Sequence, residues 1–482
     1  MLRGTATYAT AAVLQRAIPF LLLPLFVRFL TPAEFGEIGI LTTLATAAGV
    51  LLSFGLETTI FRSYLLARGD AEARRALLGT VGGFAIIVPL AISGVFIAFG
   101  APALAPTLGL PTAALQLAAA GAAVNAGATS VPLALLRADE RLGAYLQLTG
   151  LQAISTALLT ILFVVVLGWG PVGWMLAYAV ASATLLLRGL AIYRSAWSPS
   201  LDTQRLRRAL AFGLPLVPHA ASHWALAVSD RAILGAFVPA AEVGAYYVAF
   251  LLCLPISTVA TAMSQATQPL FSEAATSTEA RSEVTRASTA HAGLVGWTGA
   301  AVVLLGPPLI HLAFPPDYWR AAEFIPWQAL GLSLFGLYLL PMNAISLTAG
   351  RTKRVWMITL LAAIANVGLN LLLIPRIGTI AAAINTTIGY AILLVGVFLY
   401  SRAVCKPPIS YELIRILMSL LVVGILCLAG MLLIPFDAGG GLALRAGVLL
   451  VVSGALAFSG LLGQRARLAL GLLRAVGSRA DR

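Results

Sequence analysis

Long apolar stretches dominate this sequence of 482 residues and leave few folds open to it. A helix that crosses a bilayer needs about 20 largely apolar residues. Charged residues and Pro/Gly-rich breaks divide the chain into fourteen such stretches, at about 5–30, 36–61, 76–100, 112–136, 143–167, 171–192, 209–235, 243–267, 287–311, 323–348, 355–375, 378–400, 412–435 and 442–463. The sequence therefore predicts an all-α integral membrane protein with about fourteen transmembrane helices.

Composition supports this class and excludes others. The apolar set AVILMFWYC makes up 60% of the chain and charged residues only 10%, whereas soluble proteins carry about 25% charged residues. A soluble domain of this size could not cover its surface with so few charges. These values exclude a cytosolic enzyme, a nucleic-acid-binding protein and a disordered chain.

Basic residues are divided unevenly between the two expected sides of the membrane. The formal net charge is +13. With the N-terminus inside, 25 of the 31 Lys and Arg residues fall in inside turns and tails, and five lie at outside turns. Because cytoplasmic loops retain positive charge, we expect both termini in the cytoplasm. This topogenic role explains the charge better than a patch for nucleic acid does.

Signals for other chemistry are missing from the sequence. The three cysteines are too widely spaced for a disulfide framework or a zinc site. No phosphate-binding G-x-x-x-x-G-K-[ST] motif occurs, so we expect no cofactor and an ion gradient or the membrane potential as the energy source. The first apolar stretch is too long for a cleavable signal peptide. Ser198–Arg208 and Gln464–Val476 are amphipathic, which favours helices on the cytoplasmic leaflet.

The sequence contains an internal repeat. The turn F-L-T-P-A-E-F-G at 29–36 is followed 208 residues later by F-V-P-A-A-E-V-G at 237–244. Each turn follows a span interrupted by two prolines, Pro19 and Pro24 in one and Pro215 and Pro218 in the other. Six spans followed by six similar spans indicate parallel repeats about an axis along the membrane normal. We therefore expect six-helix bundles at 1–208 and 209–404, a helix pair with a tail at 405–482, and a substrate cavity between the bundles.

Two ionisable residues stand out in the first two spans. Arg16 lies about 11 residues into its span, or ~16 Å deep at 1.5 Å per residue, which favours a position facing a cavity over one that reaches the head groups. Glu57 lies near the inner end of the second span. It is either a protonatable group or the partner of Arg16 or Arg62 in a structural ion pair.

The seventh span carries four more ionisable residues. His219 and His223 are four residues apart and share a helix face. A metal site is not favoured because no third ligand accompanies them, and polar packing and a protonatable cavity wall both remain open. Asp230 and Arg231 lie near the outer end of the span, where a plain helix-end ion pair is one reading.

Three separate blocks carry a family resemblance. Phe212–Leu234 followed by A-E-V-G-A-Y at 241–246 resembles the seventh-span signature of the polysaccharide (O-antigen) flippases, which belong to the multidrug/oligosaccharidyl-lipid/polysaccharide exporter superfamily. Leu30–Gly36 is similar to that family's first outer turn, and 349–354 with 365–386 resembles its C-terminal segment. The blocks occur in family order. The chain departs from the family's G-x-x-G-A-A at Gly378–Ala383, which we expect to affect helix packing more than activity.

The resemblance implies two six-helix bundles around a central cavity in a bacterial cytoplasmic membrane. It implies movement of an undecaprenyl-pyrophosphate-linked oligosaccharide to the outer leaflet, with a polysaccharide polymerase and glycosyltransferases as partners. Arg16 and Arg62 would meet the pyrophosphate. The candidate substrate-binding residues are Arg16, Arg62, His219, His223 and Arg231, and the candidate coupling residues are Glu57 and Asp230.

Two other functions remain open. A cation-coupled multidrug exporter of the same superfamily would favour an acidic lumen. In this chain the positive charge of Arg16 is matched by the negative charge of Glu57, and the charges of Asp230 and Arg231 cancel each other. A non-transporting scaffold for polymer synthesis would leave Arg16 and the proline-broken spans unexplained. An enzyme is not expected, since no paired carboxylates or nucleophile constellation occurs at one depth.

Overall fold

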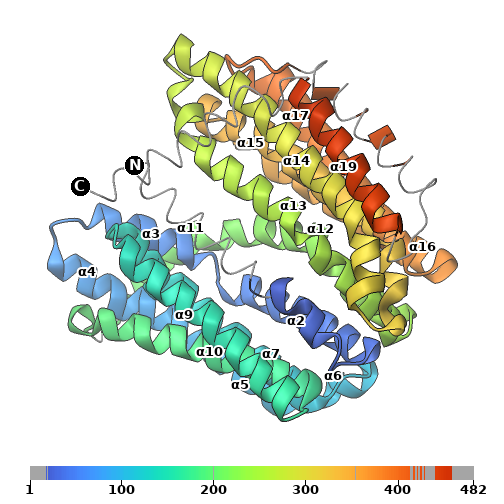
Figure 1. Ribbon diagram of the computed structural model, residues 1–482. Coiled ribbons are helices and arrows are strands. Elements are labelled where there is room, and N and C mark those ends of the chain that lie inside the picture. The colour runs from blue at the N-terminus through green and yellow to red at the C-terminus, as the bar shows by residue number, and fades with distance from the viewer. Residues whose placement is uncertain are drawn as a thin grey trace, which may run out of the picture. The chain divides into compact units, whose positions relative to one another are not determined.

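The computed structural model describes residues 18, 20–198, 200–352, 354–412, 416–417, 421, 424–425, 428 and 440–458. Within these residues every regular element is a helix (Figure 1). Ten helical stretches among them are long and apolar enough to cross a membrane. These observations confirm an all-α, multi-pass membrane protein.

The ten stretches correspond to the second to sixth and the eighth to twelfth predicted spans. They are Pro32–Leu52, Ala71–Leu108, Thr112–Ala138, Leu142–Val166, Gly170–Ile192, Ala240–Glu273, Thr278–Ala313, Ile325–Ala349, Val355–Ile377 and Ile380–Cys405. The predicted span at 5–30 lies mostly outside the described residues, those at 412–435 and 442–463 lie partly outside, and the tail Gln464–Val476 lies wholly outside.

The predicted span at 36–61 is two helices, α2 (Pro32–Leu52) and α3 (Leu56–Leu66). Helix α2 begins earlier than expected because Thr31 and Glu34 form a capping box around its first turn. The break falls at Gly55, whose φ of +66° suits glycine. An added Cβ there would lie 2.1 Å from the carbonyl oxygen of Gly213. A close backbone contact therefore fixes where α3 begins.

The predicted span at 209–235 is also interrupted. Helix α11 (Thr203–Gly213) leads through a short 3₁₀ turn, Leu214–Leu216, into α12 (Val217–Phe237). Pro215 lies in the turn and Pro218 in the first turn of α12. Proline has no amide proton to continue a helical ladder, so the interruption follows from the sequence. Helix α11 begins at Thr203, is capped by the Asp202 side chain, and extends past the predicted amphipathic segment that ends at Arg208.

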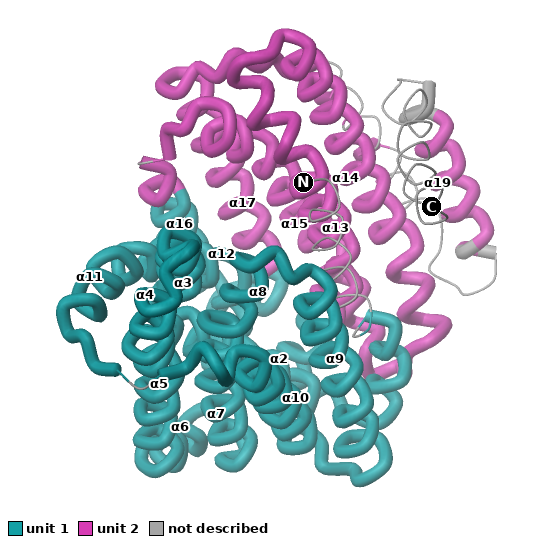
Figure 2. The backbone as a smooth tube through the Cα atoms, turned by 90° about the vertical axis from the view of Figure 1, so that its left-hand side faces the viewer, with its two compact units in different colours: residues 1–247, 359–382 teal, residues 248–358, 383–482 magenta. Residues whose placement is uncertain are grey.

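The described residues group into two compact units (Figure 2). Unit 1 lies within residues 1–247 and 359–382, and unit 2 within 248–358 and 383–482. This grouping follows spatial contacts and not the internal repeat, so the repeat-based division after residues 208 and 404 stays a prediction.

Unit 1 is organised around a helix of small residues. Besides α2, α3, α11 and α12 it contains α4 (Ala71–Leu77), α5 (Gly83–Val95), α6 (Ala101–Leu108), α7 (Thr112–Ala128), α8 (Ala134–Ala138), α9 (Leu142–Thr160) and α10 (Gly170–Ile192). Helix α7 packs against α10 and α2, and its buried alanines and glycines let these neighbours approach closely. An added Cβ on Gly121 would lie 2.6 Å from the ring of Tyr178.

Unit 2 contains α14 (Thr278–Ala313), α15 (Ile325–Asn343) and α19 (Gly440–Phe458), with α14 packed against the other two. Helices α13 (Ala240–Glu273), α16 (Val355–Ile377) and α17 (Ile380–Tyr400) contribute residues to both units.

Each unit contains a similar polar contact to the segment that follows the sixth span of its repeat. In unit 1, the Thr80 hydroxyl donates to the Ser200 carbonyl oxygen at 3.0 Å. In unit 2, the Thr285 hydroxyl donates to the Ser410 carbonyl oxygen at 2.8 Å. The two serines are 210 residues apart, close to the displacement between the repeated turns. These matching contacts support the internal repeat.

Candidate functional site

A basic cavity of about 510 Å³ lies between α3, α4 and α11 in unit 1. It is lined by Thr59, Arg62, Ser63, Leu66, Ala67, Ala73, Leu77, Asp202, Arg205, Arg208, Ala209 and Phe212. Helix α3 packs against both α8 and α11 and buries Leu56, Ile60 and Tyr64. Arg62 on α3 is exposed and lines the cavity. Three arginines and one aspartate leave the lining with a net charge of two positive.

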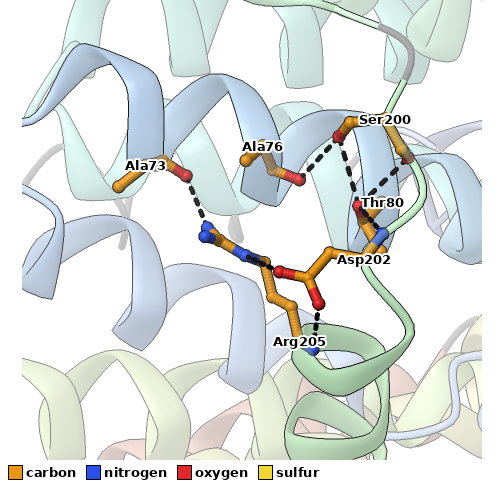
Figure 3. A network of polar contacts seen from close by, with 6 residues as sticks. All are labelled: Ala73, Ala76, Thr80, Ser200, Asp202 and Arg205. Atoms are coloured by element: carbon orange, nitrogen blue, oxygen red, sulfur yellow. Dashed lines mark hydrogen bonds and ion pairs between the residues drawn. The ribbon is translucent and has the colours of Figure 1, made fainter.

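Asp202 and Arg205 attach the start of α11 to α4 (Figure 3). The backbone amide of Arg205 donates to the Asp202 carboxylate at 2.8 Å, and the Arg205 Nε lies 3.3 Å from the same group. The Arg205 guanidinium also donates to the Ala73 carbonyl oxygen at 2.8 Å. The hydrogen bond from the Arg205 amide holds the pKa of Asp202 below its usual range, with the adjacent guanidinium acting in the same direction. Asp202 is therefore an anion at neutral pH.

Arg62 and Arg208 are the two exposed cationic side chains of the cavity. The Arg62 guanidinium lies over the ring of Phe212, 4.9 Å from its centroid, in cation–π geometry. No ion pair between described residues includes Arg62 or Arg208. The cavity therefore presents two positive charges that carboxylates of the described chain do not neutralise.

Glu57 pairs with a residue that the sequence analysis did not single out. The Arg137 guanidinium at the end of α8 donates to the Glu57 carboxylate at 2.5 Å. From the sequence, the expected partners of Glu57 are Arg16 and Arg62. Arg62 lies five residues further along the same helix and faces the cavity. Glu57 and Arg137 are 80 residues apart, and only their shared position at the inner ends of the second and fourth spans could have suggested the pair.

Asp230 and Arg231 are buried, with side chains 3% and 2% exposed. The Asp230 carboxylate accepts hydrogen bonds from the backbone amide of Arg231, at 2.8 Å, and from the Tyr246 hydroxyl. The Arg231 guanidinium lies over the ring of Tyr247, 5.1 Å from its centroid. The two residues thus belong to a four-residue buried cluster with the start of α13, which the sequence analysis did not foresee. In the described structure the cluster is closed to solvent.

His219 and His223 lie half-buried one turn apart near the start of α12. The Nδ1 atom of His219 is buried without a hydrogen-bond partner among the described residues. Among all the described residues, no three His, Cys, Asp or Glu side chains lie close enough to hold a metal ion.

The structure therefore distributes the candidate residues over several places. Arg62 lines the cavity with Arg205 and Arg208, Glu57 is on another side of the same helix, and Asp230 and Arg231 are near the far end of α12. Arg16 lies outside the described residues.

With this geometry, the chain has the fold of a multi-pass transporter. The Lipid II flippase MurJ in an inward closed conformation matches with a TM-score of 0.75 and 14% sequence identity, covering 94% of this chain and 97% of MurJ. An inward-facing multidrug resistance MATE family transporter of the MOP superfamily matches with a TM-score of 0.61 and 18% identity, over 83% and 94% of the two chains. A MOP superfamily transporter from Pyrococcus furiosus matches with a TM-score of 0.56 and 17% identity, over 84% and 96%.

The family of this protein follows from a match of its sequence to a family model. The family model described as "Polysaccharide biosynthesis protein" matches residues 1–275, more than half of the chain. The protein therefore belongs to the polysaccharide biosynthesis protein family, in agreement with the resemblance seen in its sequence. No curated protein matches it.

Proposed function

We propose that this protein is a flippase that moves an undecaprenyl-pyrophosphate-linked oligosaccharide from the cytoplasmic to the outer leaflet of a bacterial inner membrane. The observation that carries the proposal is the match to the Lipid II flippase MurJ over nearly the full length of both chains, in a member of a polysaccharide biosynthesis family. Sugars and a pyrophosphate cannot cross hydrocarbon unaided, because each unsatisfied polar group costs several kcal/mol there. A hydrated path through two helix bundles removes that cost.

In this proposal transport proceeds by alternating access, and both termini are cytoplasmic. Arg16 and Arg62 meet the pyrophosphate, with His219, His223 and Arg231 along the path. An ion gradient or the membrane potential drives the cycle, with Glu57 and Asp230 as coupling residues. A membrane potential that is positive outside favours outward movement of an anionic head group by ~2.3 kcal/mol per charge at 100 mV. A polysaccharide polymerase and glycosyltransferases are the proposed partners.

A multidrug exporter is the second candidate, because a MATE family transporter also matches the fold. The charge of the unit 1 cavity favours the flippase. Arg62 and Arg208 would repel a cationic drug and attract a phosphate-bearing substrate.

Reconstituted vesicles test the proposal. The full chain is incorporated into liposomes that contain undecaprenyl-pyrophosphate linked to a fluorescent oligosaccharide, and a membrane-impermeant reductant is added outside. We expect the protein to expose probe from the inner leaflet, faster with an imposed potential. Equal exposure with and without protein under every gradient would contradict the proposal, and uptake of a cationic dye by the same vesicles would favour the exporter.

Arg16 provides the matched test within the path. Arg16→Ala should abolish transport at unchanged expression, whereas Arg16→Lys should restore part of it, because lysine retains the charge but not the bidentate hydrogen bonding. Wild-type transport by the alanine variant would remove Arg16 from the path.

A further inference from the structure

Two arginines of the unit 1 cavity, Arg62 and Arg208, have no carboxylate partner among the described residues. Arg205 is held by Asp202 and the Ala73 carbonyl oxygen, so its position is fixed and its charge is partly neutralised. Arg62 is oriented by the Phe212 ring, and Arg208 lies one turn after Arg205 on α11. Two guanidinium groups that face one cavity from two helices are typical of a site for a multivalent oxyanion.

The hydroxyl group of Ser63 adds a donor to the same wall, whereas the Thr59 hydroxyl already donates to the Gly55 carbonyl oxygen at 3.1 Å. Thr59 and Ser63 are four apart on α3 and both line the cavity, on either side of Arg62 in the sequence. A phosphate or diphosphate would thus meet planar cationic donors and the neutral hydroxyl donor of Ser63 together. The single carboxylate of the lining, Asp202, already accepts from the amide and guanidinium of Arg205.

Apolar side chains at the same place favour a lipid over a soluble anion. Leu66 lines the cavity and is 74% exposed, and Phe212 is 39% exposed. Leu214 and Leu216 continue from α11 and are also exposed. Exposed leucine and phenylalanine beside arginine are expected where hydrocarbon meets head groups. A free phosphate would gain nothing from them.

We infer that the cavity between α3, α4 and α11 binds the phosphate-bearing head group of a membrane lipid at the cytoplasmic leaflet. This chemistry is shared by the diphosphate of the transported lipid and by an anionic phospholipid. The first occupant rests on the proposed function and makes the cavity a loading site at the entrance of the transport path, where Arg62 meets the pyrophosphate. The cytoplasmic side follows from the predicted orientation of the turns at 62–75 and 193–208.

Binding to the full chain in nanodiscs of phosphatidylcholine tests the inference. Native mass spectrometry counts bound lipid while undecaprenyl pyrophosphate or phosphatidylglycerol is titrated in. The test variants are Arg208→Gln and the double variant Arg62→Gln/Arg208→Gln. The matched control is Arg207→Gln, since Arg207 is an exposed arginine on the same helix that does not line the cavity. Each variant removes one charge per substitution from an exposed position, so we expect all of them to fold.

We expect the double variant to bind undecaprenyl pyrophosphate about tenfold or more weakly, because two charge-assisted hydrogen bonds are lost. Arg207→Gln should stay within about twofold of wild type. A loss confined to the diphosphate lipid identifies the transported lipid as the occupant, and an equal loss for phosphatidylglycerol identifies an anionic phospholipid. Identical binding by the double variant and Arg207→Gln, with both lipids, overturns the inference.

The outcome is separable from that of the proposed function, because binding is measured without translocation. Vesicles in which wild-type protein binds the diphosphate lipid but never moves it would contradict the flippase and leave the head-group site standing. Normal translocation by the wild-type protein, combined with unchanged lipid binding by the double variant, would contradict the head-group site and leave the flippase standing.

Discussion

Gly36 in α2 and Gly244 in α13 contact each other's helix reciprocally within unit 1. An added Cβ on Gly36 would lie 1.9 Å from the carbonyl oxygen of Ala240, and an added Cβ on Gly244 would lie 1.9 Å from that of Pro32. The two residues occupy the same position in the repeated turns, so the contact has approximate two-fold symmetry. Both glycines are buried, and only a missing side chain permits this distance.

Substitution of either glycine should therefore destabilise the protein. We expect Gly36→Ala and Gly244→Ala each to cost about 1–3 kcal/mol, because backbone atoms must move apart. Thermal unfolding in detergent measures the change.

Gly49→Ala is the matched control for this prediction, since Gly49 lies in the same helix α2 and an added Cβ meets nothing within 4 Å. It should be neutral or gain up to about 1 kcal/mol, because alanine favours the helix. A Gly36→Ala protein as stable as Gly49→Ala would show that the two backbones are not in contact.

The Glu57–Arg137 pair should behave as one unit in a double-mutant cycle. Glu57→Gln and Arg137→Gln should each lower transport, and the double variant should be no worse than either single variant. The contribution of the pair to the free energy of unfolding should be small, about 1 kcal/mol or less, because the Glu57 and Arg137 side chains are 43% and 32% exposed.

The pH dependence of transport distinguishes the two roles of Glu57. If Glu57 exchanges a proton in the cycle, Glu57→Gln flattens the dependence on an imposed pH gradient, whereas Arg137→Gln leaves that dependence in place. Unchanged pH profiles in both variants would assign the pair to structure alone.

The buried cluster around Asp230 should contribute more to stability than an exposed ion pair does. Tyr246→Phe removes a donor to the Asp230 carboxylate and should cost about 1–3 kcal/mol, because the carboxylate is buried. Glu323→Gln is the comparison, since Glu323 pairs with Arg320 in side chains that are 64% and 53% exposed, and it should change the unfolding temperature little. Equal effects of the two substitutions would contradict the assignment.

Accessibility of single cysteines tests the predicted orientation. In a variant with the native cysteines replaced by alanine, Ala103→Cys should react with a membrane-impermeant thiol reagent added outside intact cells, and Thr276→Cys should not. Both positions are exposed in the described structure. Labelling of the cysteine at position 276 would contradict the predicted topology. It would also contradict the cytoplasmic assignment of the cavity between α3, α4 and α11.

The sequence predicted the helical spans because the penalty for polar groups in hydrocarbon acts along the whole length of each span. It predicted the interruption at Pro215 because proline removes a helical hydrogen bond at its own position in the chain. It did not predict the break between α2 and α3, since Gly55 is placed by its contact with Gly213, 158 residues away. Partners such as Arg137 for Glu57 are likewise set by how helices pack, which a single sequence does not encode at any fixed spacing.

The contact from Arg205 to Ala73 joins α11 to α4, and the contact from Thr80 to Ser200 joins the turn after α4 to the segment before α11. Helices α4 and α11 form adjacent walls of the cavity between α3, α4 and α11. Both sides of the cavity thus belong to one compact unit and keep their spacing when that unit moves as a whole. If the protein alternates between inward-open and outward-open states as proposed, a lipid bound there would have equal affinity for both. Such a ligand does not shift the equilibrium between them, however tightly it binds. In the proposed cycle the cavity would raise the supply of substrate to the transport path, and the free energy that drives the cycle would enter elsewhere.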